Sequence, residues 1–85
     1  MCYIITMMMN VILKPNTDSS LRTRNRIREH GPSFRAERSS GSVCGLEGLC
    51  WLFKSEDGWF GWLPRSEFNW QHVKGKDYAL MMKCE

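Results

Sequence analysis

Four cysteines and two histidines are the side chains best suited to metal or redox chemistry: Cys2, Cys44, Cys50, Cys84, His30 and His72. Cys44 and Cys50 are the close pair among them, and five residues separate the two. Structural zinc sites usually have about two to four residues between paired ligands and a second pair nearby, which His30 and His72 do not supply. The pattern favours reduced, unreactive thiols over a disulfide or a metal site, and we predict no bound metal.

Catalytic patterns are weak in this sequence. Cys44 or Cys50 could pair with His72 as nucleophile and base, but a chain of 85 residues leaves little room for a substrate cleft. There is no Ser-His-acid arrangement and no Gly-rich phosphate loop, and "GLEG" at 45–48 is too short for a dinucleotide fingerprint. We therefore expect a protein that is not an enzyme and has no cofactor.

A basic segment is the first candidate binding site. Its six arginines are Arg22, Arg24, Arg26, Arg28, Arg35 and Arg38. Residues 14–40 carry seven basic and three acidic side chains, a net charge of +4, whereas residues 41–85 carry five basic and six acidic ones, a net charge of −1. Arginine donates in pairs to carboxylates and phosphates, so the segment suits an acidic protein surface or nucleic acid. A solvated helix face is the alternative without a binding role.

Large aromatic side chains form the second candidate site. The stretch "SEDGWFGWLPRSEF" at 55–68 follows a polar turn with Trp59, Phe60 and Trp62 in close succession. Side chains alternate between the two faces of a strand, and here both faces of the segments 49–54 and 59–63 are apolar. One face can fill a small interior. The surplus must lie under another segment or form an exposed patch, and a patch of several aromatics usually marks an interaction surface.

The elements that position these residues are mostly strands. We predict a single domain over residues 1–85, mainly β with one short helix, in which residues 1–13 form an N-terminal strand that Pro15 ends. Further strands are predicted at 33–38, 49–54, 59–63 and 77–84, and a 3₁₀ turn after Pro64. Asp57-Gly58 suits a hairpin loop between the strands 49–54 and 59–63, since glycine adopts positive φ readily.

The segment 20–30 has conflicting signals. Asp18, Ser19 or Ser20 can cap a helix, and Gly31-Pro32 is a helix-stop signal. The arginines, however, alternate with less polar residues in the period of a strand. The start and stop signals coincide at a sensible length, so we predict a short basic helix and keep a strand as the alternative.

The N-terminal segment "MCYIITMMMNVIL" is too short to span a bilayer and lacks the layout of a signal peptide. We therefore expect a cytoplasmic protein. Met9 is an alternative start to Met1.

Several of these residues carry a resemblance to a known fold. The segment "DGWFGWLPRSEF" resembles the end of a bacterial-type Src-homology-three-like barrel, in which a polar hairpin leads into a Gly-Trp-aliphatic strand, a Pro, a short 3₁₀ turn, a large apolar residue and a closing strand. The match covers residues 48–85. The chain also looks like small phage-encoded proteins that end in a Trp-Leu-Pro-Lys/Arg-Ser segment.

The resemblance implies a small Src-homology-three-like β-barrel over residues 33–85. It assigns Trp62, Leu63 and Phe68 to the structural core and residues 77–84 to the closing strand. The chain lacks the acidic loop and paired-Tyr strand with which eukaryotic members grip polyproline, so polyproline binding is not expected.

We accordingly expect a small protein-binding module, of the kind found among phage-type inhibitors or adaptors that act on a host protein in the host cytoplasm, for takeover or counter-defence. Its partner would be a larger protein with an acidic or apolar patch, and no membrane is involved. The expected contact residues are Trp51, Trp59, Phe60, Trp70, Arg22, Arg24, Arg26, Arg28, Arg35 and Arg38. A small barrel that binds single-stranded DNA or RNA is the alternative.

Overall fold

The computed structural model describes residues 3–38, 43, 48–73, 75 and 78–83. Its elements follow the chain in this order: β1 (Tyr3–Pro15), α1 (Leu21–His30), β2 (Ser33–Glu37), β3 (Leu49–Lys54), β4 (Trp59–Pro64), η1 (Arg65–Glu67), β5 (Phe68–His72) and β6 (Tyr78–Lys83). The protein is mainly β with one short helix, as predicted. The 3₁₀ turn after Pro64 is confirmed as η1.

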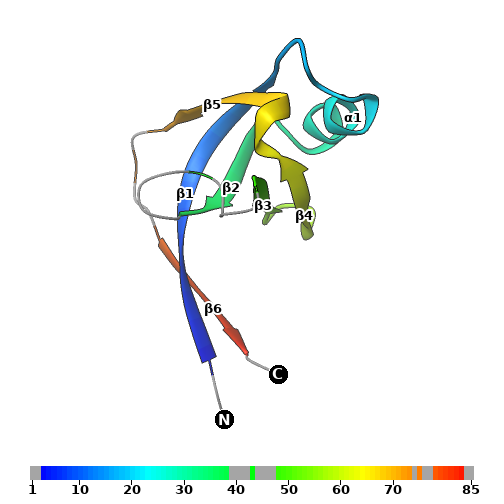
Figure 1. Cartoon of the computed structure of the whole chain (residues 1–85). Coiled ribbons are helices and arrows are strands. Elements are labelled where there is room, and N and C mark those ends of the chain that lie inside the picture. Colours follow the sequence, from blue (N-terminus) through cyan, green and yellow to red (C-terminus); the bar gives the residue numbers. More distant parts are fainter. Residues whose placement is uncertain (1–2, 39–42, 44–47, 74, 76–77, 84–85) are drawn as a thin grey trace.

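The strands form one antiparallel sheet in the order β4-β3-β2-β1-β5, and β6 pairs with β1 outside this path. Strand β1 is the centre of the arrangement (Figure 1). Its second half lies between β2 and β5, since Val11 pairs with both Phe34 and His72. Its first half pairs with β6. These two strands form a narrow ribbon that extends from the body of the molecule.

The segment 20–30 is a helix, and the alternative of a strand is wrong. Ser20 is the N-cap and its Oγ accepts a hydrogen bond from the Thr23 N–H at 3.2 Å. The Gly31 N–H closes the last turn on the Ile27 carbonyl at 2.8 Å. Thr23 and Ile27 are buried, and their i, i+4 spacing places them on one face. The helix therefore packs on the sheet through this face, while several arginines remain on the surface.

The predicted last strand at 77–84 is confirmed as β6, but the strand at 68–72 was not predicted. Residues 68–72 form β5, which pairs with β1 directly after η1, whereas the predicted strand at 77–84 corresponds to β6, which pairs with the first half of β1. The sequence "FNWQH" does alternate as a strand should: Phe68 is buried and Trp70 is half-buried, and exposed Asn69 lies between them. The sequence analysis assigned no element to residues 69–72.

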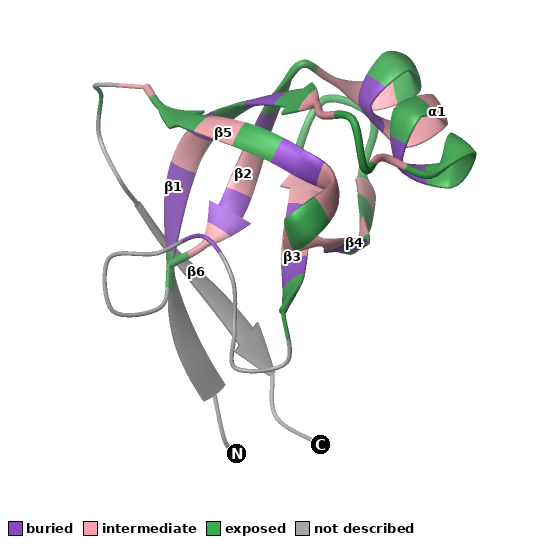
Figure 2. Cartoon of the chain, turned by 45° about the horizontal axis from the view of Figure 1, so that its top comes forward, coloured by how far each residue is buried: buried purple, intermediate pink, exposed green. Residues whose placement is uncertain are grey.

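The core is built mostly from strand residues, and α1 adds Ile27 to it from one side of the sheet (Figure 2). It consists of Met9, Val11, Leu13, Ile27, Phe34, Ala36, Val43, Cys50, Leu52, Leu63 and Phe68. Leu63 and Phe68 are fully buried, as predicted. The assignment of Trp62 to the core is wrong, because half of this residue's surface is exposed.

A polar network joins the start of α1 to η1. Glu67 Oε1 accepts hydrogen bonds from the Ser20 N–H at 2.6 Å and from the Thr23 hydroxyl at 2.9 Å. Thr23 is fully buried, and Glu67 supplies the partner that a buried hydroxyl needs. The Ser19 hydroxyl also donates to the Glu67 carbonyl. The carboxylate lies at the positive end of the helix dipole, where a negative charge is favourable.

These contacts hold the pKa of Glu67 below its ordinary value of 4.5, chiefly through the hydrogen bonds from Ser20 and Thr23, with a smaller contribution from the charge of Arg22. Because the lowered pKa belongs to the folded state, the ionised carboxylate stabilises the fold at neutral pH. This stabilisation is lost as the pH falls below 4.5 and through the lowered pKa.

We expect Glu67→Gln to lower the melting temperature at pH 7, since the charge at the helix start is lost. The difference between wild type and variant should shrink as the pH is lowered from 5 to 3, because the wild-type carboxylate then becomes neutral as well. Melting curves followed by circular dichroism at several pH values measure this, with Glu56→Gln in the exposed β3–β4 turn as the matched control. A difference that is constant with pH would contradict the assigned role.

Phe68→Ala should cost about 3 to 5 kcal/mol of unfolding free energy, since it removes a fully buried ring. Trp62→Ala should cost no more than about 1 kcal/mol, because it removes cross-strand contacts on an exposed face. Urea denaturation of the two variants measures both values. Equal losses would place Trp62 back in the core.

Candidate functional site

The hairpin of β3 and β4 carries four aromatic side chains on its outer face: Trp51, Phe53, Phe60 and Trp62. We call these four residues the aromatic face. The strand register places Trp51 opposite Trp62 and Phe53 opposite Phe60, and directly opposite residues lie on the same side of a sheet. The Trp51 ring centroid lies 6.1 Å from that of Phe53 with nearly parallel planes, and 6.3 Å from that of Phe60.

The pairing pattern brings these rings close together. The Arg65 N–H donates to the Gly48 carbonyl at 2.7 Å, one step beyond the pair of Leu49 and Pro64. Hydrogen-bonded pairs alternate along an antiparallel ladder. The pairs Trp51–Trp62 and Phe53–Phe60 are therefore non-hydrogen-bonded pairs. The side chains of such pairs lie closer together than those of hydrogen-bonded pairs.

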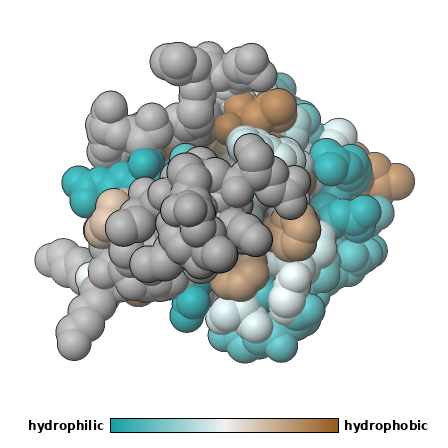
Figure 3. Space-filling view, turned by 90° about the horizontal axis from the view of Figure 1, so that it is seen from below, coloured by the Kyte–Doolittle hydropathy of each residue, from teal (hydrophilic) through white to brown (hydrophobic). Residues whose placement is uncertain are grey.

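The β4 half of the aromatic face is exposed to solvent, whereas Trp51 and Phe53 on β3 are half-buried. Phe60 is 66% exposed and Trp62 50%, whereas Cys50, Leu52 and Leu63 on the inner face are fully buried. These two aromatics alone leave roughly 200 to 300 Å² of apolar surface uncovered. Figure 3 shows separate brown and pale patches beside teal hydrophilic surface on the underside of the molecule. A typical monomer also carries an apolar patch of this order, and the largest such patch is often functional.

Trp59 explains why Trp62 lies outside. Trp59 and Gly61 share the inner face of β4 with Leu63, and the Trp59 ring lies over Gly61, so closely that a Cβ on Gly61 would approach it to 2.8 Å. Trp59 also meets the Phe34 ring edge-on at 5.9 Å. The interior beside β4 is therefore filled by the ring of Trp59, with no room for that of Trp62.

The predicted contact residues thus divide into separate groups. Trp51 and Phe60 belong to the aromatic face, whereas Trp59 and Trp70 are partly buried and pack against the core. Trp70 lies in β5, at the other end of the strand order from β4, and lines a shallow pocket there with Ile12, Lys14, Asn69 and Gln71.

The helix arginines make local contacts. Arg24 donates to the Asn16 carbonyl at 2.9 Å, Arg26 to the Glu29 carboxylate at 3.2 Å, and Arg28 to the Asn25 side chain at 2.9 Å. Arg22 is exposed and its charge acts on Glu67. These contacts occupy three of the guanidinium groups with the helix itself or the segment that leads into it.

The helix arginines and the aromatic face lie on different sides of β4. Helix α1 packs on the inner side of this strand, where its His30 stacks on Trp59, and Phe60 and Trp62 point to the outer side. Arg35 is different, because the register of β2 places it opposite Phe53 and so beside the aromatic face. Arg38 directly follows β2 and its N–H donates to the Met7 carbonyl at 2.9 Å.

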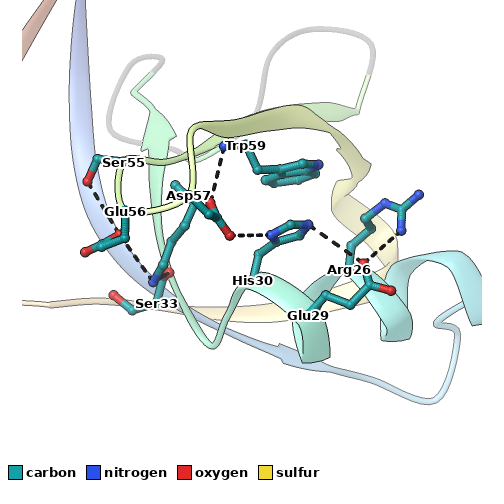
Figure 4. Close-up of polar contacts among 9 residues, drawn as sticks. Arg26, Glu29, His30, Ser33, Ser55, Glu56, Asp57 and Trp59 are labelled. Carbon is teal, nitrogen blue, oxygen red and sulfur yellow. Dashed lines mark hydrogen bonds and ion pairs between the residues drawn. The ribbon is translucent and has the colours of Figure 1, made fainter.

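A cluster that the sequence analysis did not find joins α1 to the β3–β4 turn (Figure 4). His30 Nδ1 lies 2.7 Å from Asp57 Oδ2, and the His30 ring stacks on Trp59 with centroids 4.5 Å apart and planes 13° from parallel. Glu29 lies 3.8 Å from His30 Nε2 and pairs with Arg26. The sequence offered two signals for this contact: the Asp57-Gly58 turn, and the position of His30 just before the end of the helix. Their separation of 27 residues hid the contact.

The cysteines do not form a site within the described residues. Cys50 is fully buried in the core, and Cys2, Cys44 and Cys84 lie outside the described residues. In the part of the chain that the structure describes, no group of three or more histidine, cysteine or acidic side chains is placed to hold a metal ion. None of the described helices is both long and apolar enough to cross a membrane.

Known proteins add no assignment to this geometry. No family model, curated protein or solved structure matches the chain. The case for function therefore rests on the aromatic face, the helix arginines and the cluster around His30.

The His30 contact lowers the pKa of Asp57 below its ordinary value of 3.8, mainly through the hydrogen bond between the two side chains. We expect His30→Ala to return the Asp57 pKa toward 3.8 and to lower the melting temperature, since α1 then loses its contacts with the turn. An NMR titration of the Asp57 carboxyl group from pH 2 to 6 measures the first effect. An unchanged Asp57 titration in the variant would show that the contact does not form in solution. Asp18→Asn, in the loop before α1, is a matched control for the charge of the chain.

Proposed function

We propose that the protein is a non-catalytic binding module that docks on a larger protein through the aromatic face. The observation that carries this proposal is the exposure of Phe60 and Trp62 directly opposite Trp51 and Phe53. Large, rigid aromatic side chains bury much surface at little cost in side-chain entropy, and they are enriched among the residues that dominate protein interfaces. Arg35, beside the aromatic face, extends it toward polar or acidic groups at its rim.

The separation of the arginines favours a protein partner over nucleic acid. Binding sites for single strands combine stacking aromatics with a basic groove that follows the phosphates. Here the helix arginines lie across β4 from the aromatic face, and three of them are occupied by local hydrogen bonds. The helix arginines would then act on the rate of association with an acidic partner rather than at the contact itself.

The order of elements around the aromatic face supports the proposed Src-homology-three-like barrel. The β3–β4 hairpin leads through Pro64 into η1, the buried Phe68 and a strand that closes on β1. The more specific role, an inhibitor or adaptor of phage type that acts on a host protein in the host cytoplasm, is carried by the resemblance of this hairpin and turn.

The double variant Phe60→Ala/Trp62→Ala should lose the bound protein while it keeps its fold. We expect immobilised wild-type protein to retain one or a few proteins from nuclease-treated bacterial lysate, and the double variant to retain them at least tenfold less. Leu21→Ala is the matched control, because Leu21 is 74% exposed and lies on α1. Circular dichroism spectra confirm that each variant is folded.

A variant in which Arg22, Arg24, Arg26 and Arg28 are changed to Glu tests the alternative. Capture by the aromatic face should persist, with a slower association rate. Equal retention by the wild type and by the aromatic double variant would contradict the proposal. So would binding of random oligonucleotides at physiological salt that is lost in the quadruple arginine variant.

A further inference from the structure

Strand β4 is an edge of the sheet. It ends the strand order, and among the described residues β3 is the strand that pairs with it. An edge strand presents a row of backbone donors and acceptors to any chain that can lie beside it. Proteins commonly protect such edges with charged side chains, prolines or bulges. Between Trp59 and Leu63, β4 has no charged side chain and no proline.

The register identifies which backbone groups of β4 face outward. The Arg65 to Gly48 hydrogen bond sets the alternation, so the pairs Leu63–Cys50 and Gly61–Leu52 are the hydrogen-bonded ones. The N–H and carbonyl groups of Phe60 and Trp62 therefore point away from β3, toward the open edge. Pro64 has no N–H, and η1 follows it. The open edge is thus short and is centred on the residues whose side chains are most exposed.

We propose that the occupant of this site is an extended peptide segment of the partner protein, which adds to the sheet as an antiparallel strand along the β4 edge. This proposal rests on the proposed function and names the form of its partner. The same two residues, Phe60 and Trp62, would supply both the backbone hydrogen bonds and the apolar contacts. Strand addition uses this combination, in which main-chain hydrogen bonds give affinity and alternate side chains give specificity.

The two faces of β4 define the chemistry of the peptide. Side chains directly opposite one another share a face, so peptide residues opposite Phe60 and Trp62 would extend the aromatic face and should be apolar or aromatic. On the other face, α1 and His30 already pack on Trp59, and Gly61 offers no side chain. The segment should therefore carry apolar residues at every second position and contain no proline within the paired stretch, because proline removes a donor.

The test begins with a displayed library of random twelve-residue linear peptides, selected on the full wild-type chain. We expect the enriched peptides to share apolar residues at alternate positions. The best of them is then synthesised in three forms: unmodified, with N-methyl groups on the odd-numbered amides, and with N-methyl groups on the even-numbered amides. One of the two methylated forms should bind at least tenfold more weakly than the unmodified peptide, because its edge-facing donors are removed.

Amide hydrogen exchange by NMR identifies the edge directly. In the free protein the Phe60 and Trp62 amides should exchange quickly, whereas the Gly61 and Leu63 amides, which point toward β3, should exchange slowly and serve as internal controls. Saturating peptide should slow exchange at Phe60 and Trp62 at least tenfold and leave Gly61 and Leu63 little changed.

The outcomes separate the two proposals. If peptide binding is lost in Phe60→Ala/Trp62→Ala but the wild-type Phe60 and Trp62 amides stay unprotected in the complex, the aromatic face binds and strand addition is wrong. If both amides are protected while the double variant binds equally well, the edge binds and the aromatic face does not contribute. Failure to enrich any peptide, or enrichment of helical or proline-rich patterns, overturns strand addition. Protection without peptide, together with a doubled mass in solution, would show that the occupant is a second copy of this chain.

Discussion

The pairing of β1 with three other strands is the constraint on which the rest of the structure depends. Its second half holds β2 on one side and β5 on the other, and its first half holds β6. Every strand of the sheet is thereby linked to β1 directly or through β2 and β3. Val11 and Leu13 are buried along this strand, so the same residues that order the sheet also form its core. The segment between β1 and β2 must return over the sheet, and α1 is that segment.

The small interior decides which aromatic side chains remain exposed. A domain of this size encloses little volume, and Phe34, Phe68 and the partly buried Trp59 occupy much of it beside α1. Trp59 fills the inner side of β4 because Gly61 leaves space under its ring. Strand alternation then places Phe60 and Trp62 outside. The exposed aromatic face is therefore a consequence of packing on the opposite side of the same strand.

Sequence patterns predicted the elements better than they predicted the faces. The helix followed from the candidate caps at residues 18–20 and the stop at Gly31-Pro32, and the hairpin from Asp57-Gly58, because capping and turn signals are local. The assignment of Trp62 to the core came from the resemblance and was wrong. Both faces of the segment 59–63 are apolar, so strand alternation could not show which face is inside. The contact of His30 with Asp57 was missed because it depends on how α1 docks on the hairpin. No local signal encodes that docking.

The two ends of α1 are fixed by different chemistry, and this arrangement separates the basic surface from the aromatic one. Glu67 holds the start of the helix through Ser20 and Thr23, and Asp57 with Trp59 holds its end through His30. Both acidic anchors come from segments that flank β4, at η1 and at the β3–β4 turn. The helix is thereby braced across the inner side of β4, with its arginines carried away from the outer side. The inner face of β4 is therefore covered by α1 and the ring of Trp59, and its outer face carries the exposed Phe60 and Trp62.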